Sequence, residues 1–372
     1  MTSDSPAGDP VFHWFLPVRG DSRDPGVVTP ADGSREESRI ASLQYLTLVA
    51  QAAEQAGFHS LLTPVGIGCL DPWVVCSAVA ARTEKVGFIL AFRPTLASPT
   101  LIAQQAQGFG QLFGDRLRLN VVAGGDPAEQ AAYGDHTDHD NRYAATDEAL
   151  QVIAPLLAGE RVSVAGRYVD VADAALPKPP LHRIPIYFGG ASTAATAVAA
   201  RHADTYLLWA ESLQAIASRI ENVRSQADTR SRKLRFGLRI HVLSRDTDEQ
   251  AWAEADRIQS TFDPAVIEAV QRRTGQMDSV GQSRMAALHA GRHSGDARSL
   301  TVGPNLWAGI GLVRQGVATA LVGSHDDVAD RLIEFHRTGV DEFILSGYPH
   351  LEEALRFGEE VAPRVRRALE RD

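Results

Sequence analysis

Residues 234–243 read Leu-Arg-Phe-Gly-Leu-Arg-Ile-His-Val-Leu. Their apolar, aromatic and β-branched side chains, and the helical pattern that follows, predict a β-strand. Side chains alternate along a strand, so Arg239 and His241 share one face and apolar residues occupy the other. Strands of a parallel sheet are normally covered on both faces, so a buried arginine and histidine are costly without a polar or anionic partner. An internal ion pair would satisfy them, but we favour a functional site at the mouth of a barrel.

Short apolar strands alternate with amphipathic helical patterns along the whole chain, which predicts βα units and a parallel sheet. Eight strands are expected, at residues 11–17, 60–64, 85–92, 116–122, 184–188, 205–209, 234–243 and 342–346. One continuous alternation of this kind fits an α/β fold of the (β/α)8 TIM-barrel class better than a doubly wound sheet. An open sheet with right-handed crossovers stays possible, because closure is not visible in a sequence.

We expect one domain over residues 1–372, because no low-complexity linker divides the chain. A hairpin or irregular insertion is expected at 162–180, and a long polar loop at 18–38. The largest insertion, 246–323, follows the seventh strand. Its Gly-, Ser-, Arg- and Asp-rich part, at about residues 284–304, predicts a mobile lid.

Composition limits the class of function. The formal net charge of −9 argues against nucleic acid or a membrane surface as a partner. Cys69 and Cys76 are the only cysteines, so neither a disulfide scaffold nor a zinc site is expected. Residues 1–10 lack the pattern of a signal peptide, and no apolar run reaches the roughly 18 residues of a membrane span. We therefore expect a soluble, cytoplasmic protein.

Polar and aromatic residues follow most of the expected strands. Active sites of TIM barrels lie at the carboxyl ends of the strands, so these residues should surround one polar pocket. They are Arg19, Cys69, Arg93, Asn120, Trp209, Arg239, His241, Tyr348 and His350. Cys69 could be a nucleophile, but a small buried residue is the more common role of such a cysteine.

Gly189-Gly190-Ala191-Ser192 joins an expected strand to an expected helix. Glycines allow close approach of the backbone to a ligand, and a helix start presents free N–H groups to a phosphate. An ordinary tight turn with Ser192 as the N-cap is the commoner role of such a pair of glycines. No dinucleotide-binding or P-loop pattern is present.

Several long segments together resemble the alkanesulfonate monooxygenases of the bacterial luciferase-like family. The resemblance runs from about Phe12 to the last helix. Its strongest segments are His13–Pro17, Ala91–Thr95, Pro185–Gly190, Arg235–Val242, Asp278–Gln282, Pro304–Gly309 and Leu345–Glu353.

The resemblance implies a TIM barrel that receives reduced FMN from a partner NAD(P)H:flavin reductase and uses O2 to cleave a C–S bond. The products would be sulfite and an aldehyde, and the substrate a small organosulfonate. A homodimer or homotetramer is also implied. By position, the resemblance assigns catalysis to Cys69, Trp209, Arg239, His241, Arg314 and Tyr348. It assigns flavin contacts to Asn120, His139, Tyr143, Gly190, Ala191 and Ser192.

A sulfonate is a permanent anion with three acceptor oxygens, which suits guanidinium groups better than ammonium groups. Arg239 on a strand and Arg314 on the insertion would form such a clamp, and His241 would help in proton transfer. A closing lid would keep water away from the reaction.

The chain also departs from the family pattern. Arg19 replaces the family's histidine and Val18 its threonine, while Val65, Ile67 and Leu70 replace polar neighbours of Cys69. We therefore treat Arg19 and His350 as candidate substrate contacts, and expect Arg19 to favour a more anionic or differently shaped sulfur substrate.

Three alternatives stay open: a related flavin monooxygenase acting on a sulfone or another organosulfur compound, a non-catalytic flavin-binding barrel, and a metal-dependent hydrolase. The last is disfavoured, because the strand ends lack a cluster of His and Asp ligands.

Overall fold

The computed structural model describes residues 8–26, 38–292 and 295–371. Eight parallel strands form a closed barrel in the order β10-β9-β6-β5-β4-β1-β15-β11, because β10 and β11 also pair with each other. The barrel strands are β1 (Val11–Phe15), β4 (Ser60–Thr63), β5 (Gly87–Phe92), β6 (Leu117–Val121), β9 (Ile186–Gly189), β10 (Thr205–Trp209), β11 (Arg235–Arg245) and β15 (Glu342–Ser346). The predicted TIM barrel is confirmed, and closure, which the sequence left open, is established by the β10–β11 pairing.

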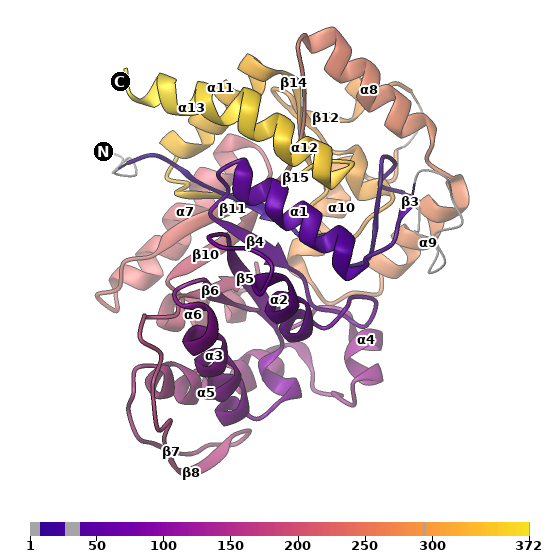
Figure 1. The fold of residues 1–372 in the computed structure, drawn as a ribbon. Helices are drawn as coiled ribbons and strands as arrows, with labels where there is room; N and C mark the ends of the chain where they lie inside the picture. The colour runs from indigo at the N-terminus through magenta and orange to yellow at the C-terminus, as the bar shows by residue number, and fades with distance from the viewer. Residues whose placement is uncertain (1–7, 27–37, 293–294, 372) are drawn as a thin grey trace.

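Helices surround this barrel (Figure 1). Helix α12 lies against α1, so early and late parts of the chain meet on the outside of the barrel. The surrounding helices are α1 (Leu43–Gln55), α2 (Pro72–Ala80), α3 (Pro99–Phe113), α5 (His139–Leu157), α6 (Thr193–His202), α7 (Leu213–Asp228), α11 (His325–Arg337), α12 (His350–Arg356) and α13 (Ala362–Leu369). The helix expected near the C-terminus is divided by a π-helical turn at Phe357–Val361.

Short strands and helices lie in the loops that connect the barrel strands and helices. The hairpin expected within 162–180 is present as β7 (Val162–Ala165) and β8 (Asp170–Ala174). Short elements that the sequence did not indicate are β2 (Asp21–Ser22), β3 (Ser38–Arg39), the 3-10 turn η1 (Pro94–Leu96) and α4 (Pro127–Ala132). Most of the polar loop expected at 18–38 lies outside the described residues.

The segment after β11 is a folded addition at one side of the barrel (Figure 1). It contains α8 (Asp248–Ser260), α9 (Pro264–Thr274), α10 (Val280–His289), the 3-10 turns η2 (Ala297–Leu300) and η3 (Gly309–Leu312), and the strands β12 (Thr301–Gly303), β13 (Leu306–Trp307) and β14 (Ala320–Ser324). The part predicted as a lid, 284–304, includes the end of α10, η2 and β12, and residues 293–294 lie outside the described residues. Its mobility stays a prediction.

Strand β11 is long because it pairs both with strands of the barrel and with β14 of the addition. Its first half pairs with β10 and β15 inside the barrel. Its second half extends beyond the mouth and pairs with β14, from His241 opposite Ala320 to Arg245 opposite Ser324. This strand therefore connects the barrel core to the addition. None of the helices in the described ranges is long and apolar enough to cross a membrane.

The opposite end of the barrel holds a buried carboxylate. Glu342, the first residue of β15, is 1% exposed. Its oxygens accept a hydrogen bond from Tyr187 Oη at 2.6 Å, form an ion pair with Arg235 Nε at 3.2 Å, and lie 3.1 Å from His13 Nε2. Burial alone would raise the pKa of Glu342, but His13, Arg235 and Tyr187 together lower it to about 2. The carboxylate is therefore ionised and joins three strands and the start of β11 at this end.

We predict that Glu342→Gln lowers the free energy of unfolding by about 3 kcal/mol at pH 7. A carboxylate whose folded pKa lies below its ordinary value of 4.5 stabilises the fold above that pH, and this stabilisation is lost as pH falls toward 2. The difference between variant and wild type should therefore shrink between about pH 5 and pH 3 in urea unfolding. Glu352→Gln is the control, because Glu352 is 44% exposed and pairs with Arg39, so it should cost about 1 kcal/mol or less. A pH-independent difference would contradict this account.

Candidate active site

Arg239 is a buried cation at the mouth of the barrel. Its guanidinium donates to Ile344 O at 3.2 Å, Ile240 O at 3.0 Å and Ser346 Oγ at 2.8 Å, and lies over the ring of Phe15 at 4.9 Å. None of the Asp or Glu side chains in the described ranges forms an ion pair with it. The ion pair that the sequence left as an alternative is therefore not formed.

This burial has an electrostatic cost. Burial lowers the pKa of Arg239 to about 9, Tyr348 acts in the opposite direction, and Arg314 lowers it further. The guanidinium still carries its charge at neutral pH, but no anion compensates it. Desolvated charges are normally paired, so the arrangement fits a site where an anion completes the structure.

His241 lies on the same face of β11 as Arg239, as the alternation predicts. Its Nδ1 is 2.6 Å from Ser346 Oγ, which also accepts from Arg239, so the hydroxyl hydrogen is available to His241. The ring stacks on Tyr348 with centroids 5.4 Å apart. Burial, followed by the charges of Arg239 and Arg314, lowers the pKa of His241 well below its ordinary value. His241 is therefore a neutral side chain at physiological pH.

Arg314 comes to the mouth from the addition, directly after η3. Its Nη1 donates to Tyr348 Oη at 2.7 Å, and its guanidinium lies over the Tyr348 ring at 5.4 Å. Burial raises the pKa of Tyr348, and Arg314 and Arg239 reduce this effect. The phenol is therefore protonated at neutral pH and can still donate its hydrogen.

A small cavity is lined by Arg314, Arg19 and His350, with Phe15 and Pro64 in its walls. Arg19 is exposed, and neither it nor Arg314 has a carboxylate partner within the ranges that the structure covers. Other arginines near the mouth are paired: Arg93 with Glu129, and Arg142 with Asp278. Three unneutralised guanidinium groups are thus found in one region, in a chain whose net charge is −9.

His350, the first residue of α12, is held by a carboxylate. Asp21 accepts from His350 N at 2.7 Å and lies 2.8 Å from its Nδ1, while Tyr45 Oη donates to the same carboxylate. Burial alone would raise the pKa of Asp21, but His350 and Tyr45 more than offset it, and the pKa is lowered. Both side chains are almost completely buried. His350 Nε2 is buried as well and has no hydrogen-bond partner among the described residues.

Cys69 and Trp209 border the same region. Cys69 lies in the loop after β4, and burial raises the pKa of its thiol, with Arg19 acting in the opposite direction and Glu129 adding to it. The thiol is therefore protonated at neutral pH, which disfavours a nucleophilic role. Trp209, at the end of β10, is half-buried and packs with Met285, Val317 and Ala318 of the addition.

The residues expected to contact a flavin come from three neighbouring places: Asn120 from β6, His139 and Tyr143 from α5, and Gly190, Ala191 and Ser192 from the turn between β9 and α6. The buried Asn120 Oδ1 has no hydrogen-bond partner among the described residues. Gly190 has a φ of +143°, and a Cβ there would lie 2.9 Å from Tyr143 Oη and 2.7 Å from Ala195 Cβ. The two rings of His139 and Tyr143 have centroids 5.0 Å apart.

The turn that follows Gly190 leads through Ala191 into α6. Ser192 is the N-cap of α6 and accepts from Ala195 N at 3.1 Å. Asn120 with its free oxygen, the close approach allowed by Gly190 and the start of α6 fit a phosphate-bearing ligand such as FMN. The geometry of these residues is compatible with a bound flavin. Their contacts with a flavin stay predictions.

The mouth is a continuous arc of adjacent strands. In spatial order it runs β6, β9, β10, β11, β15 and β1. Trp209 ends β10, so it lies between β9, which leads to the expected flavin contacts, and Arg239 on β11. The addition is attached above this arc by ion pairs of Arg273 with Asp126 at 2.8 Å and of Arg142 with Asp278 at 2.5 Å.

Sequence reasoning missed Ser346 and Asp21. Ser346 stands in the segment Leu345–Glu353 that carries the resemblance, and its position opposite His241 would follow from the register of two parallel strands. Asp21 lies 329 residues from His350, and no local pattern connects them. No group of three or more His, Cys, Asp or Glu side chains in the described ranges is arranged to hold a metal ion.

Comparison with known proteins identifies the family. The family model described as luciferase-like monooxygenase matches residues 12–342, which is most of the chain. The protein therefore belongs to the luciferase-like monooxygenase family. This confirms the broader part of the resemblance, while the alkanesulfonate assignment requires a separate test.

Solved structures share the fold at low sequence identity. A riboflavin lyase, RcaE, with modified FMN and riboflavin, has a TM-score of 0.80 and 19% identity, and the match covers 97% of this chain and 92% of that one. The EDTA monooxygenase EmoA from Chelativorans sp. BNC1 has a TM-score of 0.77 and 20% identity over 97% and 94% of the two chains. An F420-dependent secondary alcohol dehydrogenase with an F420-acetone adduct has a TM-score of 0.69 and 17% identity, covering 96% and 100%.

We predict that Arg239→Met raises the free energy of unfolding of the ligand-free protein by about 2 kcal/mol, because it removes an uncompensated buried charge. The control is Arg245→Met. Arg245 pairs with the buried Glu353 at 3.1 Å, so this variant leaves a carboxylate with a weaker counter-charge and should lose about 3 kcal/mol. Chemical denaturation measures both. A loss of stability in Arg239→Met equal to that in Arg245→Met would show that the Arg239 charge is already compensated.

Proposed function

We propose that this protein is a monooxygenase that uses reduced FMN and O2 to cleave the C–S bond of an alkanesulfonate, giving sulfite and an aldehyde. A transient NAD(P)H:flavin reductase would supply the reduced flavin. The observation that carries the proposal is the group formed by Arg239, Arg314 and Arg19, three guanidiniums without carboxylate partners in the described ranges around one end of the barrel.

A sulfonate suits this group of charges. It is ionised at every physiological pH, and its three oxygens accept hydrogen bonds from planar guanidiniums. Arg239 is fixed by three hydrogen bonds on a barrel strand, so it binds and orients without rearrangement. Arg314 donates to Tyr348 and has further N–H groups for a ligand.

Asn120, His139, Tyr143, Gly190, Ala191 and Ser192 are the residues that would hold FMN. Bound reduced FMN would supply two electrons and the activation of O2. Tyr348 and Arg314 would donate hydrogen bonds to oxygens that gain negative charge. The addition, which is attached over the mouth by Arg273 and Arg142, would exclude water from the reaction.

Two other assignments are less well supported by the site. A sulfone carries no charge, so three unneutralised guanidiniums would have no counter-ion in the complex. A non-catalytic flavin-binding barrel would not need a cationic cluster beside the flavin contacts. The fold also accommodates F420, as the dehydrogenase illustrates, so the flavin itself should be checked by the absorption spectrum of the bound cofactor.

The exposed Arg19 favours a substrate with a second anionic group. We propose that it extends the cationic region toward the loop of Cys69, where it lies beside Gly68. EmoA, whose substrate EDTA is a polyanion, shows that the fold can serve a highly charged substrate. Arg19→His should reduce the preference for sulfoacetate over ethanesulfonate. An unchanged ratio of the two activities would refute this role of Arg19.

We predict that sulfite release from a panel of sulfonates requires O2 and a flavin reductase, and that Arg239→Met and Arg314→Met each lower kcat/KM by about 100-fold or more. The matched control is Arg272→Met, because Arg272 is exposed on α9 and pairs with Glu268. A coupled assay of sulfite is the measurement. The absence of sulfite from every sulfonate, or full activity in Arg239→Met, would refute the proposed reaction.

We also propose that the protein forms the predicted oligomer through the face of α1, α2 and α3, with a second copy as the occupant. Helices α2 and α3 contain no charged residue, and α1 contains only Glu54. The three helices are neighbours on the outside of the barrel (Figure 1). Val74 on α2 is 68% exposed, and Leu101 and Leu48 are exposed on α3 and α1.

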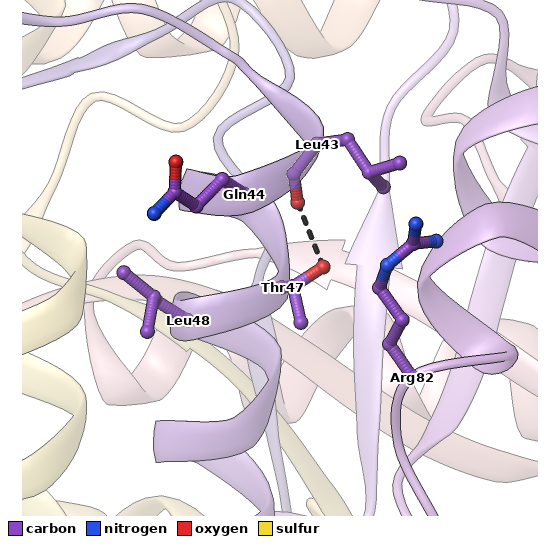
Figure 2. A pocket seen from close by; sticks show the side chains of 5 residues that line it. All are labelled: Leu43, Gln44, Thr47, Leu48 and Arg82. Carbon is purple, nitrogen blue, oxygen red and sulfur yellow. Dashed lines mark hydrogen bonds between the residues drawn. The ribbon is translucent and has the colours of Figure 1, made fainter.

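A face that packs against a second copy removes its side chains from water in both copies, so unpaired charges there are unfavourable. Figure 2 shows a shallow pocket on this side, between Leu43 and Leu48 of α1 and the exposed Arg82 that follows α2. The uncharged helices therefore favour a second copy over a charged partner.

We predict that Val74→Glu with Leu101→Glu converts the oligomer into a smaller species, because both carboxylates would be buried beside their own copies. Val280→Glu is the control, since Val280 is exposed on α10, away from these helices. Sedimentation velocity measures the mass. A monomeric wild-type protein, or an unchanged mass in the double variant, would contradict this assignment.

A further inference from the structure

We propose that His350, oriented by Asp21, is the proton-transfer residue of this site, and that His241 acts as a neutral hydrogen-bonding group. This inference rests on the proposed function and deepens it. It assigns to His350 the proton transfer in which the sequence analysis expected His241 to help.

The first observation is the geometry of the Asp21–His350 pair. The carboxylate of Asp21 lies 2.8 Å from His350 Nδ1 and also binds the backbone N–H of the same residue at 2.7 Å. Tyr45 donates to that carboxylate from α1. A carboxylate can only accept, so Nδ1 carries a hydrogen and the second ring nitrogen, Nε2, is the basic atom.

The second observation is that Nε2 is free. It is buried without a hydrogen-bond partner in the described part of the chain, although His350 forms part of the wall of the cavity that Arg314 and Arg19 also line. A buried, unsatisfied nitrogen is costly, so it indicates a group that meets a ligand. The ring is fixed on its other sides by Tyr348, edge-to-face at 5.0 Å, and by Phe15 at 5.7 Å.

The third observation is the contrast between the two histidines. His241 has the guanidinium of Arg239 as a neighbour through Ser346, and none of the carboxylates in the described part of the chain forms a hydrogen bond or ion pair with it. A proton on His241 would therefore add a second buried cation. His350 has an ionised carboxylate to balance the charge that it gains. The titratable and charged groups that face His350 are Asp21 and Tyr45 behind the ring, Tyr348 beside it, and Arg314, Arg19 and His241 on the side of the site.

The proposed reaction requires such a base. In the overall conversion, the substrate carbon next to sulfur loses one hydrogen as a proton. One oxygen atom of O2 becomes the aldehyde oxygen and the other becomes water, and sulfur leaves as hydrogen sulfite. Reduced FMN and the substrate each give two electrons to O2. His350 would take the carbon-bound proton at Nε2 and release it to the departing sulfite, so the ring is unchanged at the end of the cycle.

We predict that His350→Gln lowers kcat for sulfite release by about 100-fold or more with little change in KM, because the base is lost while the guanidinium groups stay in place. Asp21→Asn should move the acid limb of the pH profile to lower pH, because the protonated ring loses its counter-ion. Arg272→Met serves as the control, because Arg272 is exposed on α9 and pairs with Glu268, so its limb should stay near that of wild type. Activity of His350→Gln within threefold of wild type would overturn the inference.

A measurement on the ligand-free wild-type protein does not depend on turnover. Long-range 1H–15N spectra of 15N-histidine-labelled protein, assigned with His350→Gln and His241→Asn, report the protonation of each ring. We expect His350 to carry its hydrogen at Nδ1, with Nε2 as the basic nitrogen, while His241 stays neutral as the pH falls. Protonation of His241 with a neutral His350 would overturn the inference even if no sulfonate were a substrate. Failure of the sulfite assay with the expected spectra would refute the proposed reaction alone.

Discussion

The arrangement at the mouth of the barrel depends on one uncompensated charge. Arg239 places a guanidinium among buried side chains, where it is fixed by two carbonyl oxygens and a hydroxyl instead of a carboxylate. Neutral acceptors orient the group without cancelling its charge. The positive potential is therefore preserved for a ligand. Burial first, and then this charge, lower the pKa of His241 and keep its ring neutral.

The two ends of the barrel treat buried charge in opposite ways. At the end opposite the mouth, Glu342 is surrounded by Arg235, His13 and Tyr187. Its charge is neutralised there and stabilises the contacts between strands. At the mouth, Arg239 and Arg314 share no such partner in the described ranges. This division agrees with the general pattern of TIM barrels, in which one end supplies stability and the other supplies chemistry.

The sequence alone predicted the eight barrel strands and much of the mouth, but not the closure of the barrel, which depends on the pairing of β10 with β11. Alternation placed Arg239 and His241 on one face of a strand, and the order of strands placed Tyr348 and His350 near them. It could not determine whether Arg239 was paired, because that depends on which of 46 acidic residues lies nearby in the folded chain. The same limit applies to Asp21 and His350, whose contact spans 329 residues. Glu342 is the first residue of a predicted strand, where a charged side chain is usually exposed to solvent, yet it is buried.

The double pairing of β11 has an evolutionary consequence. Because β14 lies parallel to the second half of β11, the chain leaves this pair of strands at Arg245 and returns to it at Ala320, opposite His241. The whole excursion between them can therefore be lengthened, shortened or exchanged without changing the spacing at its two attachment points. Such a module allows one catalytic scaffold to acquire new ligand preferences through replacement of a single continuous segment, while the barrel strands keep their sequence.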